Sequence, residues 1–195
     1  FELLEMKYQD GKQIERENMN LLSMSSFLNE SSLTLNNQML HKYQKEVVDQ
    51  FRIQSENRYV LSAPTSFGKT FLTYEIIKKL NYSNILLIFP TISLLSENYL
   101  KLTSDKFFAP YKIHTLSEVK AEELGEKNIF IYTPERYLSF LDNTNKYFEF
   151  TFIDEIYKID NDFIIDNDTP EEHERDTAYR LSLEYACRNS GDMLL

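Results

Sequence analysis

The octapeptide APTSFGKT (residues 63–70) lies between a short apolar run, Tyr59 to Leu61, and an amphipathic stretch, Phe71 to Leu80. This order predicts a strand, a loop and a helix. A helix N-terminus binds phosphate groups because its first backbone N–H groups have no partner within the helix. Lys69 would add a positive charge and Thr70 a hydroxyl for a metal ion. The stretch therefore predicts a phosphate-binding loop.

This loop departs from the generic pattern G-x-x-x-x-G-K-[ST] at one position. Ala63 stands where the first glycine would be, and Gly68 matches the second. The nucleotide-binding prediction therefore depends on support from motifs elsewhere in the chain.

The size and composition of the chain predict a soluble, packed globule of one ordinary domain. It has 195 residues, of which 42% are hydrophobic and 14% aromatic, and this argues against disorder. The single cysteine, Cys187, excludes an internal disulfide and fits a reducing compartment. Neither an apolar run of about 20 residues nor a signal peptide is present, so we expect a cytoplasmic protein without a membrane span.

The net charge of −10 argues against nucleic-acid binding at first sight, because neutralised phosphates supply most of the affinity of such proteins. The charge is unevenly placed, however. The segment from Asp154 to Asp176 carries most of the negative charge, with only Lys158 and Arg175 to offset it. The remainder is nearly neutral, so a local binding face stays open. We interpret the acidic segment 160–176 as a solvated insertion.

Five apolar runs alternate with helical stretches in the middle of the chain. The runs predict strands at 59–62, 84–89, 112–115, 128–132 and 148–153, and the stretches between them predict helices at 69–80, 92–103, 117–124 and 134–141. Such alternation predicts an α/β fold with a mainly parallel sheet covered by helices on both faces. Ligands of such sheets bind at the carboxyl ends of the strands.

The flanks of this region complete the predicted organisation. Residues 1–39 have Leu and Met at helical spacing and predict a helical N-terminal extension, with breaks at Gly11 and at the Ser/Asn-rich stretch 29–37, and 40–54 predict a further helix. After Ile159 we expect a polar stretch to Asp176, a helix at 177–189 and the start of another strand. The predicted domains are therefore 1–39 and 40–195.

A predicted strand ends in two adjacent carboxylates, Asp154 and Glu155. A magnesium nucleotide needs a carboxylate near the metal ion, and its hydrolysis needs a second group to orient or deprotonate water. Asp154 suits the first role and Glu155 the second. Two acids can also simply begin a solvated loop, but the phosphate loop some 85 residues earlier favours the functional reading.

Five motifs in order, covering residues 40 to 160, resemble superfamily 2 helicases. Residues 63–70 resemble motif I, in which alanine normally replaces the first glycine, and the wording Pro-Thr-Ser is similar to the Ski-like and DExH branches. Residues 154–157 resemble motif II. The remaining resemblances are Phe89-Pro90-Thr91 with Leu94 and Leu95 to motif Ia, Thr133-Pro134-Glu135-Arg136 to motif Ib, and Gln44 to the Q motif.

The resemblance implies the first RecA-like domain of an ATP-dependent helicase or translocase, with ATP and Mg²⁺ as cofactors. It implies single-stranded RNA or DNA as partner. Catalysis would involve Lys69, Asp154 and Glu155, and the metal ion would be held by Thr70 and Asp154. Nucleotide binding would involve Gln44, Pro64, Thr65, Ser66, Phe67, Gly68, Lys69 and Thr70. Nucleic-acid binding would involve Pro90, Thr91, Thr133, Pro134 and Arg136.

The residue chemistry agrees with these roles but also has simpler explanations. Thr91 and Thr133 follow strand ends, where hydroxyls and free N–H groups can hold a sugar-phosphate backbone, although both can also be plain helix caps. The prolines before or after them suit helix starts. Arg136 could contact phosphate. The amide of Gln44 can donate to and accept from an adenine edge.

Three departures from the family bear on mechanism. Ser66 replaces a glycine of many relatives, Tyr157 replaces the His or Asp of motif II, and the chain stops before motif III. We therefore expect a second RecA-like domain, with its arginine fingers, in the full-length protein. A duplex-DNA translocase and a non-motor nucleotide-binding scaffold remain alternatives. The Asp-Glu-Ile-Tyr wording and the acidic segment also resemble helicase subunits of bacterial anti-phage systems such as Hachiman, which implies a nuclease or effector partner.

Overall fold

The computed structural model describes residues 34–35, 38–40, 42–64, 67–144, 146–156 and 170–195. Contacts divide the chain between Glu46 and Val47 into two compact units. In the first unit, β1 (Thr34–Leu35) pairs antiparallel with β2 (Gln38–Met39). β1 lies within the predicted break at 29–37, so among the described residues of the extension the helical prediction is wrong only at β2. The rest of that prediction lies outside the described residues. Helix α3 (Lys42–Gln50) crosses the boundary between the units.

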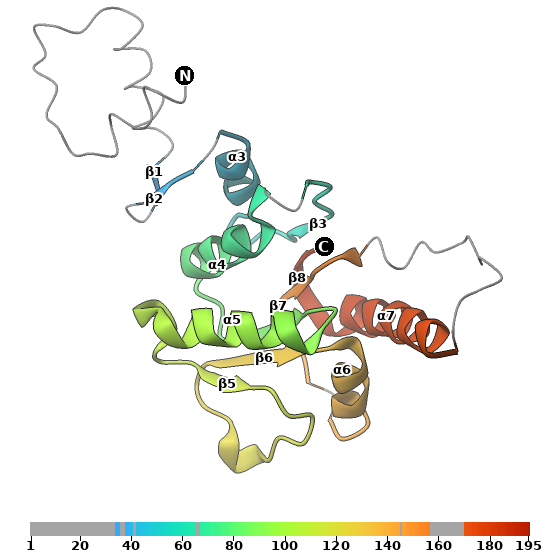
Figure 1. Cartoon of the computed structure of the whole chain (residues 1–195). Coiled ribbons are helices and arrows are strands. Elements are labelled where there is room, and N and C mark those ends of the chain that lie inside the picture. Colours follow the sequence, from blue (N-terminus) through green and yellow to red (C-terminus); the bar gives the residue numbers. More distant parts are fainter. Residues whose placement is uncertain (1–33, 36–37, 41, 65–66, 145, 157–169) are drawn as a thin grey trace, which may run out of the picture. The chain divides into compact units, whose positions relative to one another are not determined.

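The second unit contains a parallel sheet in the order β3-β8-β7-β4-β6-β5, and every described pair is parallel (Figure 1). This confirms the predicted α/β class. The strand that follows α7 lies between the first and fifth predicted strands. The strands are β3 (Arg58–Tyr59), β4 (Asn84–Ile88), β5 (Lys112–His114), β6 (Asn128–Tyr132), β7 (Phe148–Ile153) and β8 (Ser190–Leu194).

The helices of this unit are α4 (Lys69–Leu80), α5 (Ile92–Ser104), α6 (Pro134–Leu141) and α7 (Pro170–Asn189). The chain moves from β3 to β4 and β5 in one direction across the sheet, then returns through β6 and β7 to β8. Because parallel crossovers are right-handed, α4 and α5 belong on one face, and α6 and α7 on the other. No helix in the described part of the chain is both long and apolar enough to cross a bilayer.

Side-chain alternation along the strands builds a core on both faces of the sheet. On one face, Leu86 and Ile88 of β4 join a buried cluster with Phe140 of α6 and Tyr179 of α7. Residues of the opposite parity serve the other face, where the rings of Phe51 and Phe150 meet edge to face with centroids 6.1 Å apart. Both faces are therefore apolar and covered.

The predicted helix at 117–124 is wrong, because only a short 3₁₀ turn, η4 (Ala121–Glu123), forms there. The carbonyls of the preceding extended segment accept hydrogen bonds from side chains instead of from a helix backbone. Tyr132 Oη donates to the Leu116 carbonyl at 3.0 Å, and Arg136 Nη1 donates to the Thr115 carbonyl at 3.1 Å. These side-chain hydrogen bonds satisfy the two carbonyls, so the extended segment after β5 needs no helical backbone bonds at these residues.

Two predicted helix boundaries also need correction. Helix α7 begins at Pro170, seven residues before the predicted start. Proline suits the first helical position, so part of the presumed acidic loop is helix. Helix α3 spans 42–50 rather than 40–54. A second 3₁₀ turn, η3 (Lys106–Phe108), follows α5.

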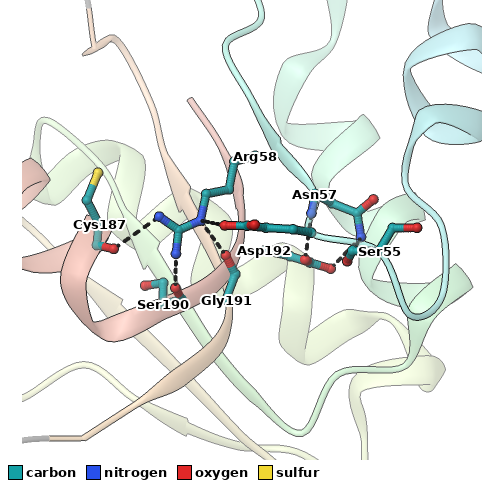
Figure 2. A network of polar contacts seen from close by, with 8 residues as sticks. Ser55, Asn57, Arg58, Cys187, Ser190, Gly191 and Asp192 are labelled. Atoms are coloured by element: carbon teal, nitrogen blue, oxygen red, sulfur yellow. Dashed lines mark hydrogen bonds and ion pairs between the residues drawn. The ribbon is translucent and has the colours of Figure 1, made fainter.

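A buried polar network ties the start of β3 to its neighbour β8 (Figure 2). Asn57 is fully buried, and its backbone N and Nδ2 donate to the two carboxylate oxygens of Asp192 at 3.0 and 2.8 Å. Tyr82 Oη donates to the same carboxylate at 2.5 Å. Burial, followed by the Asp192 carboxylate, raises the pKa of Tyr82 far above its usual value, so the phenol remains a donor.

Arg58 completes this network from the other side (Figure 2). Its guanidinium donates to the carbonyls of Cys187, Ser190 and Gly191 at 3.2, 2.7 and 3.0 Å. These carbonyls end α7 and begin β8, and a cation at a helix C-terminus also favours the helix dipole. The network therefore sets the position of β8 beside β3.

We expect Asn57→Ala to lower the free energy of unfolding by about 2–3 kcal/mol, because it leaves the half-buried Asp192 carboxylate without its amide partner. Urea denaturation measures this loss. Asn143→Ala is the matched control, since Asn143 Nδ2 donates only to the Ser139 carbonyl at an exposed site and its loss should change stability by less than about 0.5 kcal/mol. Equal losses in the two variants would contradict the structural role of the network.

Candidate nucleotide and nucleic-acid site

The predicted site residues of the second unit follow the carboxyl ends of strands of the parallel sheet. Along this edge the phosphate loop follows β3, the Asp154-Glu155 pair follows β7, Thr91 follows β4 and Thr133 follows β6. Neighbouring strands are about 4.8 Å apart, so β3 and β7, with β8 between them, are about 10 Å apart. The order gives the edge two halves: the phosphate loop and the carboxylates on one side, the two threonines on the other.

The phosphate loop leads directly into α4. Gly68 precedes the helix with φ of 79°, in the left-handed region that favours glycine, and as the N-cap residue it has no side chain to cap the helix. Lys69 Nζ reaches back across the loop and donates to the Ala63 carbonyl at 3.4 Å. The N-terminus of α4 thus presents backbone N–H groups and a lysine on the same loop, which is the arrangement that binds a phosphate chain.

Two loop residues with predicted roles, Thr65 and Ser66, lie outside the described residues. Next to them, Phe67 N donates to the Pro64 carbonyl at 3.0 Å. Thr70 is half-buried in the first turn of α4. The roles assigned to these five residues stay predictions.

The Asp154-Glu155 pair ends β7 in a fixed and unusual conformation. Asp154 N donates to the Ile88 carbonyl at 3.0 Å, and Glu155 N donates to Asp154 Oδ1 at 3.0 Å. Glu155 has φ of 55°, a left-handed conformation that costs a non-glycine residue about 1–2 kcal/mol. Tyr179 Oη of α7 donates to the Asp154 carbonyl at 3.2 Å. Hydrogen bonds to the N–H and C=O groups of Asp154 and to the N–H of Glu155 therefore fix the peptide between the two carboxylates.

The two threonines both cap helices, as their simpler interpretation predicts. Thr91 Oγ1 accepts from Leu94 N at 3.2 Å, and Thr133 Oγ1 accepts from Arg136 N at 3.4 Å. Their accessibility differs, because Thr91 is exposed whereas Thr133 is 6% exposed. Of these two side chains, that of Thr91 is thus the one accessible to a nucleic-acid strand.

The other residues predicted to bind nucleic acid differ in the same way. Pro90 is half-buried and Pro134 is buried in the first turn of α6. The Arg136 guanidinium donates to the Thr115 carbonyl. It therefore organises the segment after β5, and its contact with phosphate stays a prediction.

Gln44 lies on α3 and is half-buried. It belongs to the first unit, so its predicted role in reading adenine stays a prediction. Tyr157, the unusual residue of the motif II resemblance, lies outside the described residues.

A magnesium ion fits the donor chemistry of Thr70 and Asp154. A hydroxyl and a carboxylate are hard oxygen donors, and Mg²⁺ takes its other ligands from substrate phosphates and water. Within the described residues, no three His, Cys, Asp or Glu side chains form a cluster that could hold a metal ion on its own. The available donors therefore suit an ion that is shared with nucleotide phosphates.

Sequence reasoning missed Tyr179 as a neighbour of this site. The buried residues Ala178, Tyr179, Ser182 and Ala186 recur at helical spacing, so a buried face of α7 could be predicted. The strand end that this face reaches depends on the return path of the chain across the sheet, which the spacing does not contain.

Fold and site together define a P-loop nucleotide-binding domain with a parallel sheet. The family model described as DEAD/DEAH box helicase matches residues 41–169, which is well over half of the chain. The chain therefore belongs to the DEAD/DEAH box helicases, whose function is ATP-dependent and acts on nucleic acid, and which use ATP, usually with Mg²⁺. A search of curated proteins found no match.

Proposed function

We propose that the chain is the first RecA-like lobe of a superfamily 2 motor that hydrolyses ATP to move along a single strand of nucleic acid. The observation that carries this proposal is the order of groups along one sheet edge: phosphate loop, carboxylate pair, then two helix starts. ATP and the strand would occupy adjacent halves of the same edge. A movement at the ATP half of the edge can then reach the nucleic-acid half through β7 and β4, which are hydrogen-bonded neighbours.

In the proposed reaction, the oxygen of a water molecule forms a bond to the γ-phosphorus of ATP, and the bond from that phosphorus to the β,γ-bridging oxygen breaks. ADP and inorganic phosphate result. The Glu155 carboxylate orients the water and accepts its proton, which then passes to phosphate or solvent. The Lys69 ammonium and the N–H groups of α4 stabilise the negative charge on the β- and γ-phosphates.

Thr70 and Asp154 are the residues that would hold Mg²⁺ against the phosphates. The bound ion would neutralise charge that develops on the phosphate oxygens. A second RecA-like lobe in the full-length protein would supply the arginine fingers that complete the charge stabilisation at the phosphates.

The assignment to a particular helicase subtype depends on the residues found in motifs I and II. Pro64-Thr65-Ser66 favours the Ski-like branch, and the Asp154-to-Tyr157 wording together with the acidic segment favours an anti-phage helicase subunit that acts with a nuclease or effector. A phage plating assay tests this subtype. It compares plating efficiency on cells with the intact gene, cells without the gene and cells with the gene for the Lys69→Ala variant. Equal plating in all three strains would remove it and leave the motor proposal intact.

We expect single-stranded RNA or DNA to raise the ATPase rate of the full-length protein at least about tenfold over the rate without nucleic acid. Steady-state phosphate release with defined single strands of RNA, single strands of DNA, duplex DNA and no nucleic acid measures this. Stimulation by duplex alone would favour a duplex-DNA translocase. Tight ATP binding with no turnover in any condition would favour the non-motor scaffold.

A further inference from the structure

Helix α7 contacts two different motifs at the carboxyl edge of the sheet. Tyr179 Oη donates to the Asp154 carbonyl, and Ser182 Oγ donates to the Pro134 carbonyl, both at 3.2 Å. Side chains three residues apart lie on the same face of a helix. Tyr179 is 4% exposed and Ser182 is fully buried. One face of α7 therefore joins the end of β7 to the start of α6.

The contact at β7 acts on the strained part of the site. The left-handed φ of Glu155 persists only if its surroundings hold it. The Asp154 amide is held by the Ile88 carbonyl, and the Asp154 carbonyl is held by Tyr179. Both backbone polar groups of Asp154, its N–H and its C=O, are thus hydrogen-bonded. The peptide that leads to Glu155 therefore has a defined orientation, and this orients the Glu155 carboxylate.

The contact at α6 acts on the predicted nucleic-acid half of the edge. Pro134 is the first residue of α6, and its carbonyl has a second lone pair besides the one that the helix backbone uses. Ser182 occupies this acceptor from α7 in a buried environment. The helix start that Thr133 caps is thereby linked to the same rigid element that holds Asp154.

We propose that Tyr179 and Ser182 are positioning residues that couple the hydrolytic carboxylate to the nucleic-acid half of the edge. The proposal rests on the proposed function, and it assigns neither residue a contact with ATP, metal ion or nucleic acid. Helix α7 (Pro170–Asn189) follows directly after residues 41–169, which the family model matches. If a bound nucleic-acid strand moves α6, the Ser182 contact would move α7, and the Tyr179 contact would then move the Asp154-Glu155 peptide.

Tyr179→Phe in the full-length protein tests the first arm, because it removes one hydroxyl and keeps the ring. We expect kcat for ATP hydrolysis at saturating single strand to fall about ten- to a hundredfold, since small misplacements of catalytic groups have effects of this size. The KM for ATP should stay within about twofold, because the phosphate loop is unchanged. Ser182→Ala tests the second arm, and should lower the maximal stimulation by single strand about fivefold while unstimulated turnover stays within about twofold.

Two variants serve as matched controls. Tyr111→Phe removes a buried phenol that donates to the Tyr82 carbonyl at 2.6 Å, and Ser139→Ala removes a hydroxyl that donates to the Glu135 carbonyl at 3.1 Å within α6. Both should keep kcat and stimulation within about twofold of the wild type. Thermal midpoints and binding of a fluorescent ATP analogue, measured on all variants, separate misfolding from misplacement.

The outcomes separate this inference from the proposed function. Tyr179→Phe and Ser182→Ala behaving like their controls, in a wild type that shows strand-stimulated turnover, would overturn the coupling and leave the motor standing. A rise in KM with unchanged kcat would overturn it too, because it would mean a binding role. If Tyr179→Phe fails to fold, the stimulation measured for Ser182→Ala decides. A wild type without nucleotide turnover would overturn both proposals.

Discussion

Lys69→Ala is expected to abolish strand-stimulated ATPase activity, with kcat at least about a hundredfold below the wild type. Lys69 Nζ lies 3.4 Å from the Ala63 carbonyl of the same loop, at the start of α4. We propose that its ammonium faces the β- and γ-phosphates. Removing it takes away charge stabilisation that the backbone N–H groups alone cannot replace. Phosphate release by the full-length protein at saturating ATP measures the loss.

The control for this substitution is Lys101→Ala. Lys101 is an exposed lysine near the end of α5 that pairs with Glu97 at 2.6 Å, and surface pairs of this kind contribute at most about 1 kcal/mol. Its loss should leave turnover within about twofold of the wild type. Full activity in Lys69→Ala would contradict the assignment of residues 63–70 as a phosphate-binding loop.

Glu155→Gln is expected to keep ATP binding and to slow hydrolysis by two to four orders of magnitude, the usual contribution of a positioned general base. The amide has the size of the carboxylate but cannot accept a proton, so only the hydrolytic step should suffer. Equilibrium binding of an ATP analogue and single-turnover phosphate release measure the two properties separately. The left-handed backbone at Glu155 should be unaffected, since the substitution changes only the end of the side chain.

Glu184→Gln is the matched control on α7, where Glu184 pairs with Arg188 at 2.5 Å on the exposed surface. We expect its binding and turnover to equal those of the wild type within about twofold. Unimpaired turnover in Glu155→Gln would show that this carboxylate does not position the water. Loss of ATP binding in Glu155→Gln would instead give the residue a structural role at the nucleotide.

Much of the fold could be predicted from local patterns. The bounds of β6, β7, α4 and α6 agree with the predicted ranges, because each is a continuous apolar run or an amphipathic stretch with a clear start. Gly68 before α4 and Pro134 at the start of α6 mark two of these starts. Failures occurred where tertiary contacts decide: the segment after β5 is extended because Tyr132 and Arg136 bind its carbonyls.

The site was predictable in its residue types and less so in its contacts. Spacing and strand ends indicated the phosphate loop and the Asp154-Glu155 pair, and the parallel sheet brings both to one edge. Spacing did not indicate that Thr133 is buried or that Arg136 is engaged with Thr115. It also did not indicate that Tyr179 reaches Asp154. These facts depend on strand order, which is a long-range property of the chain.

The position of β8 has a consequence for how the protein is made. In the described sheet β3 is an edge strand, and its hydrogen-bonded neighbour is β8, so Asn57 finds Asp192 across 135 residues of chain. Contacts between such distant residues form late, because loop closure must come first. A nascent chain on the ribosome can build β4, β6 and β7 while β3 still waits for its partner. We therefore expect the phosphate loop to be among the last parts to acquire its final geometry.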